Sequence, residues 1–214
     1  MEYAASELKA ALGARRQLAV VLGGGNLMRG AAVSDRGLRR IRADRCGMLA
    51  TISNAIMFQD YLESAGIASQ ILSALPIEGM VNSFTVERCI SELETGRVVL
   101  LAAGTGQPFF STDTAAALRA IQIDADIMLK ATRVDGVYTA DPEKDDTAKL
   151  HEHLSYHYVL DHELGVMDLT AVAACMKNGL PVRVFNYNVK GNLRAALCGE
   201  PIGTLIEGEN NGHG

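Results

Sequence analysis

The sequence predicts an α/β fold, a three-layer α/β/α sandwich in which helices cover both faces of a mainly parallel sheet. Two observations predict it. Short runs of consecutive apolar residues, typical of strands buried on both faces, alternate with longer segments whose apolar residues recur at helical spacing. Chains that alternate in this way usually build a parallel sheet, because each helix carries the chain back to the starting end of the sheet.

Composition favours one compact globular domain. The chain has 214 residues, of which 48% are hydrophobic and 21% charged, as in ordinary soluble domains. We predict a single domain over residues 1–206, because no linker or repeat divides the chain. Residues 207–214, Glu-Gly-Glu-Asn-Asn-Gly-His-Gly, have no apolar anchor and are predicted to form a disordered tail.

Charge and cysteine content exclude several functional classes. A formal net charge of −5 gives no basic field for nucleic acid, so no nucleic acid substrate is expected. No apolar run approaches the roughly 20 residues that cross a bilayer, and no membrane association is expected. Four cysteines without a CxxC pattern are typical of reduced thiols, which indicates a cytoplasmic protein.

The elements follow one another in a regular order. Strands are predicted at 18–22, 67–72, 98–103, 127–129 and 182–185, and helices at 4–12, 46–65, 84–95, 112–123 and 168–178. Gly66, Gly96 and Gly179 each fall between a helix and the next strand. A helix commonly ends there on a left-handed residue, so we assign these glycines a capping role only.

The first motif is the glycine turn Gly23-Gly24-Gly25-Asn26, which directly follows the first strand. Without side chains, its amides can approach a phosphate closely, and a helix N-terminus after the turn would favour the same anion. Arg29, one turn further on, could bind the same oxygens. The alternative is an ordinary tight turn in which the glycines serve only the backbone.

The second motif is the loop from Ala103 to Thr114, which follows the most apolar strand. It combines glycine amides, hydroxyl groups and two aromatic rings, a set that suits the phosphate, ribose and base of a nucleotide. Loops at the carboxyl ends of strands are where α/β sheets bind ligands. In the alternative interpretation Phe109 and Phe110 fill the core, and Ser111, Thr112 and Asp113 cap the next helix.

The third motif spans Lys130 to Pro142. Its dipeptides Asp135-Gly136 and Asp141-Pro142 are turn signals, so a hairpin-like excursion is the simplest interpretation. The segment becomes specific only together with the other two motifs.

Five segments in this order resemble the motifs of bacterial uridylate kinases of the amino acid kinase superfamily: GGGNLMRG, DRCGMLAT, GTGQPFFSTDTAA, ATRVDGVYTADP and GVMDLTA. The resemblance extends from near residue 5 to about residue 206. It implies the amino acid kinase fold and an ATP-dependent phosphotransferase that converts UMP and ATP to UDP and ADP in pyrimidine nucleotide biosynthesis.

The resemblance also implies roles for individual residues. The UMP site would be formed by Gly24, Asp44, Thr105, Gly106, Gln107, Pro108, Phe109, Phe110, Ser111 and Thr112, with Asp44 accepting hydrogen bonds from ribose hydroxyls. The ATP site would be formed by Gly25, Arg29, Thr132, Tyr138 and Asp141. Arg29, Asp113 and Asp168 would serve catalysis.

Further properties of the family follow as expectations. The reaction would use ATP with Mg²⁺, and the protein would be a cytoplasmic homohexamer, activated by GTP and inhibited by UTP. His153 and His157 have the i, i+4 spacing of metal ligands, but the family has no histidine metal site in this region. We therefore predict no metal-ligating residues and assign the histidines between 151 and 162 to a solvated helix and turn.

The chain departs from the family at its first strand. That strand reads like KLSGE in the family, and its lysine bridges the phosphates of both nucleotides; no such segment precedes the first helix here. Two interpretations stay open: the domain is N-terminally incomplete, or the chain is a catalytically impaired nucleotide- or anion-binding protein on the same fold. The absence of this strand would leave neighbouring strand edges unpaired, so we expect an unstable or aggregation-prone chain.

Overall fold

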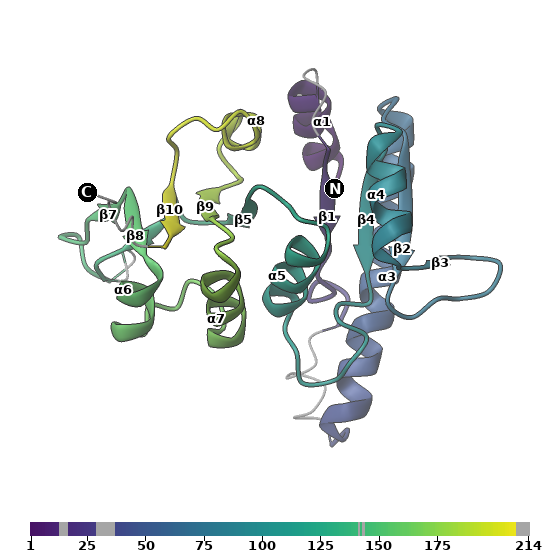
Figure 1. Ribbon diagram of the computed structural model, residues 1–214, viewed down its shortest axis with the longest axis horizontal. Coiled ribbons are helices and arrows are strands. Elements are labelled where there is room, and N and C mark those ends of the chain that lie inside the picture. Colours follow the sequence, from purple (N-terminus) through teal and green to yellow (C-terminus); the bar gives the residue numbers. More distant parts are fainter. Residues whose placement is uncertain (13–16, 29–36, 141, 143, 209–214) are drawn as a thin grey trace. The chain divides into compact units, whose positions relative to one another are not determined.

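The computed structural model describes residues 1–12, 17–28, 37–140, 142 and 144–208. Contacts group the chain into two compact units, residues 1–116 and 117–214, and each unit is described by itself below (Figure 1). The single domain over 1–206 stays a prediction.

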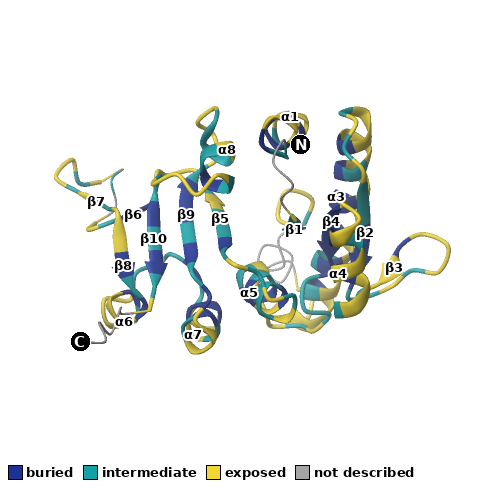
Figure 2. Cartoon of the chain, turned by 45° about the horizontal axis from the view of Figure 1, so that its top comes forward, coloured by how far each residue is buried: buried dark blue, intermediate teal, exposed yellow. Residues whose placement is uncertain are grey.

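The first unit is built on a fully parallel sheet with the strand order β1-β4-β2-β3. Its strands are β1 (Ala19–Val21), β2 (Ser69–Ser73), β3 (Asn82–Ser83) and β4 (Val98–Ala102). All five residues of β4 are buried, since β4 lies between two strands and under helices (Figure 2). Helix α3 (Arg40–Ser64) packs on β2 and β4, α4 (Val86–Glu94) packs on β4, and α1 (Glu2–Ala11) contacts α3.

The second unit has a mixed sheet with the order β5-β9-β10-β8. β5 (Met128–Thr132) is parallel to β9 (Val182–Asn186), β10 (Thr204–Glu207) is antiparallel to β9, and β8 (His153–Ser155) is parallel to β10. β6 (Val137–Tyr138) and β7 (Leu150–His151) form an antiparallel pair. The predicted hairpin-like excursion over Lys130 to Pro142 thus contains β6, while its partner strand lies further along the chain. The helices are α6 (Tyr156–Asp161), α7 (Leu169–Asn178) and α8 (Asn192–Leu197).

The predicted strands and helices are all present, with ends shifted by a few residues, and α5 (Thr112–Gln122) continues from the first unit into the second. The capping role of Gly66, Gly96 and Gly179 is consistent with their φ angles of 80°, 80° and 64°. The largest shift concerns α3, which begins at residue 40 rather than 46. Its first turns carry many charged residues and so lack the apolar period that marks a buried helix.

Two sequence assignments differ from the structure. The histidine segment predicted as helix and turn begins with strand residues: His151 ends β7 and His153 starts β8, and only His157 lies in a helix. Short strands of this kind carry too few residues to show a period. The predicted tail starts with Glu207, which instead is the last residue of β10 and bonds to His153 through its side chain, with an Nε2 to Oε1 distance of 2.9 Å. Residues 209–214 of the tail lie outside the described residues.

β1 and β3 are the edge strands of the first sheet, and β5 and β8 are the edge strands of the second. Among the described residues β1 pairs only with β4, and β5 pairs only with β9. The expected instability from unpaired strand edges stays a prediction. No helix in the described ranges is both long and apolar enough to cross a bilayer.

Candidate active site

The glycine turn after β1 is fastened to helix α3. The Asn54 side chain, 2% exposed, donates from Nδ2 to the carbonyl oxygen of Gly23 at 2.6 Å. It also exchanges hydrogen bonds with the Asn26 side chain, at 2.6 and 3.1 Å. An asparagine inside a helix is unfavourable by propensity, so the buried contacts explain its presence. Residues 29–36 after this turn, Arg29 among them, lie outside the described residues, so the helix expected to follow the turn stays a prediction.

Gly24 allows the turn to approach α3 closely. A Cβ atom built on Gly24 would lie 2.6 Å from the Gly47 carbonyl oxygen and 3.0 Å from the Ala50 Cβ atom. The structure therefore gives this glycine a packing role in addition to the proposed UMP contact. Gly25, the predicted ATP contact in the same turn, is exposed.

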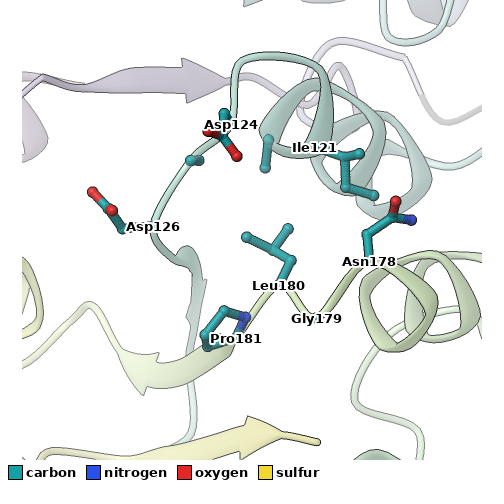
Figure 3. A pocket seen from close by; sticks show the side chains of 9 residues that line it. Ile121, Asp124, Asp126, Asn178, Gly179, Leu180 and Pro181 are labelled. Atoms are coloured by element: carbon teal, nitrogen blue, oxygen red, sulfur yellow. The ribbon is translucent and has the colours of Figure 1, made fainter.

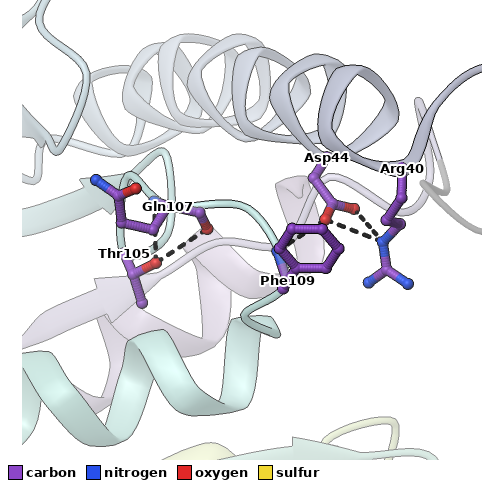
Figure 4. Close-up of polar contacts among 5 residues, drawn as sticks. All are labelled: Arg40, Asp44, Thr105, Gln107 and Phe109. Atoms are coloured by element: carbon purple, nitrogen blue, oxygen red, sulfur yellow. Dashed lines mark hydrogen bonds and ion pairs between the residues drawn. The ribbon is translucent and has the colours of Figure 1, made fainter.

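The loop after β4 carries most of the predicted UMP contacts. The Thr105 hydroxyl accepts the Gln107 amide at 3.1 Å and donates to the Gln107 carbonyl oxygen at 3.2 Å, which closes a tight turn at Gly106 (Figure 4). After Pro108, Phe109 and Phe110 are 64% and 52% exposed, so neither ring fills the core. This exposure overturns the core-filling alternative and leaves two flat apolar surfaces available for a base.

Ser111 caps helix α5, as the alternative interpretation of the loop expected. Its Oγ atom accepts the Thr114 amide at 3.0 Å. Thr112 is the first residue of α5, and Asp113 lies in the first turn, where a carboxylate is favoured by the helix dipole. Capping and ligand binding are compatible, because both use the amides at a helix N-terminus.

Asp44 joins helix α3 to the loop. Its carboxylate accepts Arg40 Nε at 2.7 and 2.9 Å and the Phe109 amide at 2.8 Å, and the Arg40 guanidinium lies over the Phe109 ring, 5.8 Å from its centre (Figure 4). In these contacts Oδ1 accepts from Arg40 alone. A carboxylate oxygen has two lone pairs, so Oδ1 can accept a ligand hydroxyl without breaking these bonds.

In the second unit, the predicted ATP contact Thr132 lies at the carboxyl end of β5, beside the end of the adjacent parallel strand β9, and Tyr138 lies on β6. Thr132 ends β5, and its hydroxyl donates to the Val134 carbonyl oxygen at 2.6 Å. Asn186 ends β9 and donates from Nδ2 to Asp135 Oδ1 at 2.9 Å, while the Tyr138 hydroxyl donates to Asp135 Oδ2 at 3.3 Å. Burial raises the pKa of Tyr138 above 10.0, and the Asp135 carboxylate adds to the shift. Adjacent strand ends of this kind are a common ligand position in α/β sheets.

Of the two remaining predicted site residues, Asp168 is described by the structure and Asp141 is not. Asp168 is the N-cap of α7, where its Oδ1 atom accepts the Ala171 amide at 3.0 Å. The structure thus gives Asp168 a capping role, and its catalytic role stays a prediction. Asp141 lies outside the described residues.

A pocket of about 270 Å³ lies elsewhere in the second unit (Figure 3). It is lined by residues in the last turns of α5 and α7 and just after them, among them Asp124, Asp126, Asn178 and Pro181. None of the predicted site residues lines it, so the pocket does not belong to the candidate active site.

Comparisons with known proteins agree with this geometry. A turn and loops at the carboxyl ends of parallel strands are typical of an α/β ligand-binding protein. The model of the amino acid kinase family matches residues 1–186. The chain belongs to the amino acid kinase family and, within it, to the uridylate kinases. Its fold is that of UMP kinase structures, a mainly parallel central sheet with helices on both sides.

The relatives match over nearly the whole chain. A uridylate kinase of Marinobacter nauticus is 48% identical over 207 residues, which is 97% of this chain and 86% of the relative. One of Shigella dysenteriae is 48% identical over 206 residues, 96% of this chain and 86% of the relative. The crystal structure of UMP kinase from Bacillus anthracis superposes with a TM-score of 0.94 at 33% identity, and it covers 97% of this chain and 86% of its own.

Sequence reasoning missed three residues that hold the site together. Thr51 and Asn54 lie on the same side of α3 as Asp44, and Asn186 ends β9 beside Thr132. The positions 44, 51 and 54 are seven and three residues apart, which is the spacing of one helix face. This run of three polar residues on a helix face that is otherwise buried is a sequence signal that could have identified Thr51 and Asn54.

Proposed function

We propose that this chain is a UMP kinase that transfers the γ-phosphate of ATP to UMP, giving UDP and ADP in pyrimidine nucleotide biosynthesis. The main observation in support is that helix α3 is hydrogen-bonded both to the glycine turn and, through Asp44, to the 103–112 loop. This occurs in a chain 48% identical to a uridylate kinase over 97% of its length. The comparisons do not favour an impaired binding protein.

The chemistry suits such a site. The attacking oxygen of UMP is already ionised near neutral pH, so the protein needs no strong base and must instead orient and neutralise two anions. In the first unit, Asp44 would accept a ribose hydroxyl, and Phe109 and Phe110 would contact the base. The amides of the glycine turn would face phosphate.

ATP would bind through Gly25, Arg29, Thr132, Tyr138 and Asp141. Thr132 pairs with Asn186 at the ends of β5 and β9. The Tyr138 hydroxyl on β6 bonds to Asp135, which also binds Asn186, and this link supports a shared ligand. The hydrogen bonds that the Thr132 and Tyr138 hydroxyls make to neighbouring groups would orient them toward it.

Mg²⁺ would supply charge neutralisation between the phosphates when bound. No group of three or more His, Cys, Asp or Glu side chains within the described ranges could hold a metal by itself. Mg²⁺ bound with ATP is usually held by substrate phosphates, water and only one or two carboxylates, so it does not require a site made of protein side chains alone.

We further propose a cytoplasmic homohexamer that is activated by GTP and inhibited by UTP. The assembly is supported by a stripe of exposed apolar side chains on α3, namely Leu49, Ile56, Met57 and Tyr61, each 39% to 51% exposed. Exposed apolar patches commonly mark contacts between proteins.

The test is ADP release from ATP and Mg²⁺ with UMP, CMP or no acceptor, together with calorimetric titration of UMP. We expect UMP-dependent turnover at about 1 to 100 per second. A folded chain that binds UMP without turnover would instead be an impaired binding protein. Failure to bind UMP at all would overturn the proposal.

A further inference from the structure

The loop after β4 holds two residues in an unfavourable backbone conformation. Ala103 has φ 62° and Phe109 has φ 72°, and both are non-glycine residues in the left-handed region. Such conformations persist only where surrounding contacts impose them, and they cluster at functional sites. Ala103 precedes the stretch that carries the predicted UMP contacts, and Phe109 lies within it.

The amides of both residues are bound by side chains of α3. The Ala103 amide donates to Thr51 Oγ1 at 2.7 Å, and the Phe109 amide donates to Asp44 Oδ2 at 2.8 Å. Thr51 and Asp44 are seven residues apart, so they lie two turns apart on one face of the helix. The two strained positions of this loop are therefore tethered to one rigid element.

Each acceptor is itself oriented. The Thr51 hydroxyl donates to the Met48 carbonyl oxygen at 2.7 Å, which directs a lone pair of Oγ1 toward Ala103. Arg40 Nε binds both oxygens of Asp44. Thr51 is only 6% exposed, so water cannot readily replace it as the acceptor.

We propose that Thr51 is a positioning residue of the nucleotide site: by holding the Ala103 amide it keeps the 103–111 loop in the strained shape that receives UMP. Asp44 holds the far end of the same loop. This inference rests on the proposed function, because it names how the UMP site is kept in shape. Thr51 acts through the loop and does not contact the nucleotide.

The kinetic test compares Thr51→Val, which keeps the shape and loses the hydroxyl, with Thr51→Ser, which keeps the hydroxyl. In Thr51→Val we expect KM for UMP to rise about fivefold or more, while KM for ATP stays within about twofold. Thr51→Ser should keep KM for UMP near that of the unmodified chain. A folded Thr51→Val with unchanged KM for UMP, or Thr51→Ser with the same defect, would overturn the proposal.

Amide exchange in the ¹⁵N-labelled chain tests the tether without any substitution. Although the Phe109 side chain is exposed, its amide should exchange about tenfold more slowly than that of Phe110, and Ala103 should also be protected. In Thr51→Val the Ala103 protection should fall. Fast exchange at Ala103 and Phe109 in the unmodified chain would overturn the inference even if Thr51→Val does not fold. If the unmodified chain does not phosphorylate UMP, the proposed function fails, while exchange still decides whether the tether exists.

Discussion

Asp44 is the residue on which most of the proposed UMP site depends. It accepts hydrogen bonds from Arg40 and from the Phe109 amide, and its Oδ1 atom can accept one more hydrogen bond from a ligand. Charged hydrogen bonds are typically worth more than neutral ones, so one side chain can orient a loop and bind a ribose hydroxyl.

Asp44→Asn tests this role. The amide cannot accept at both atoms and carries no charge, so we expect KM for UMP to rise about tenfold or more, with KM for ATP within about twofold. Asp60→Asn, which removes an exposed carboxylate from the same helix, is the control and should leave both constants unchanged. Equal KM values for Asp44→Asn and the unmodified chain would remove Asp44 from the proposed site.

At the scale of elements, α3 and the loops that it holds are the central feature. The pattern of apolar runs and helical spacing predicted every long element, since periodicity is a local property of the sequence. The elements it missed are short, such as the strands β3 and β8, of two and three residues, and the six-residue helix α8. Their existence depends on pairing and packing with distant residues.

A pair of glycine substitutions tests how closely the turn packs on α3. Gly24→Ala would place a methyl group 2.6 Å from a backbone oxygen, and we expect it to lower the free energy of unfolding by about 1 to 3 kcal/mol. Gly47→Ala meets nothing within 4 Å and should raise that free energy by up to about 1 kcal/mol through helix propensity. Urea unfolding measures both, and equal effects would contradict the packing argument.

A buried thiol in the second unit predicts how stability depends on pH. Burial raises the pKa of the Cys175 thiol from 9.0 to about 11, and burial also raises the pKa of Tyr156, whose hydroxyl bonds to the Leu180 carbonyl oxygen. Because the folded state favours the neutral thiol, its contribution is fully present below pH 9 and is lost as pH rises toward 11. We expect a loss of about 2 kcal/mol from Cys175 over this range.

Urea unfolding between pH 8 and pH 10.5 checks this expectation. Cys175→Ala should make the decline of stability with pH shallower. Cys198→Ala removes an exposed thiol and should leave the decline unchanged. The same slope in both variants would show that Cys175 is not the titrating group.

At the scale of the whole molecule, the exposed stripe on α3 bears on assembly. Leu49, Ile56, Met57 and Tyr61 recur at helical spacing on the face that is not buried on the sheet. A water-facing surface with this pattern favours association with another apolar surface.

Ile56→Lys tests the proposed homohexamer by sedimentation velocity. A charge at this position would have to be buried in the contact, so we expect the variant to sediment as a smaller species than the unmodified chain. Glu87→Gln on α4 changes the net charge by the same amount and should assemble normally. A monomeric unmodified chain, or an Ile56→Lys variant of full size, would contradict this use of the stripe.

The sequence by itself determined the α/β class, the long elements, the family and the glycine and hydroxyl loops, because periodicity and motif order are local or linear features. The tertiary structure alone decided which side chains hold those loops. Thr51 binds an amide 52 residues away, Asp44 one 65 residues away and Asn54 a carbonyl oxygen 31 residues away. Such partners are set by how a helix packs on a sheet, since only packing brings residues so distant in the chain within hydrogen-bonding distance.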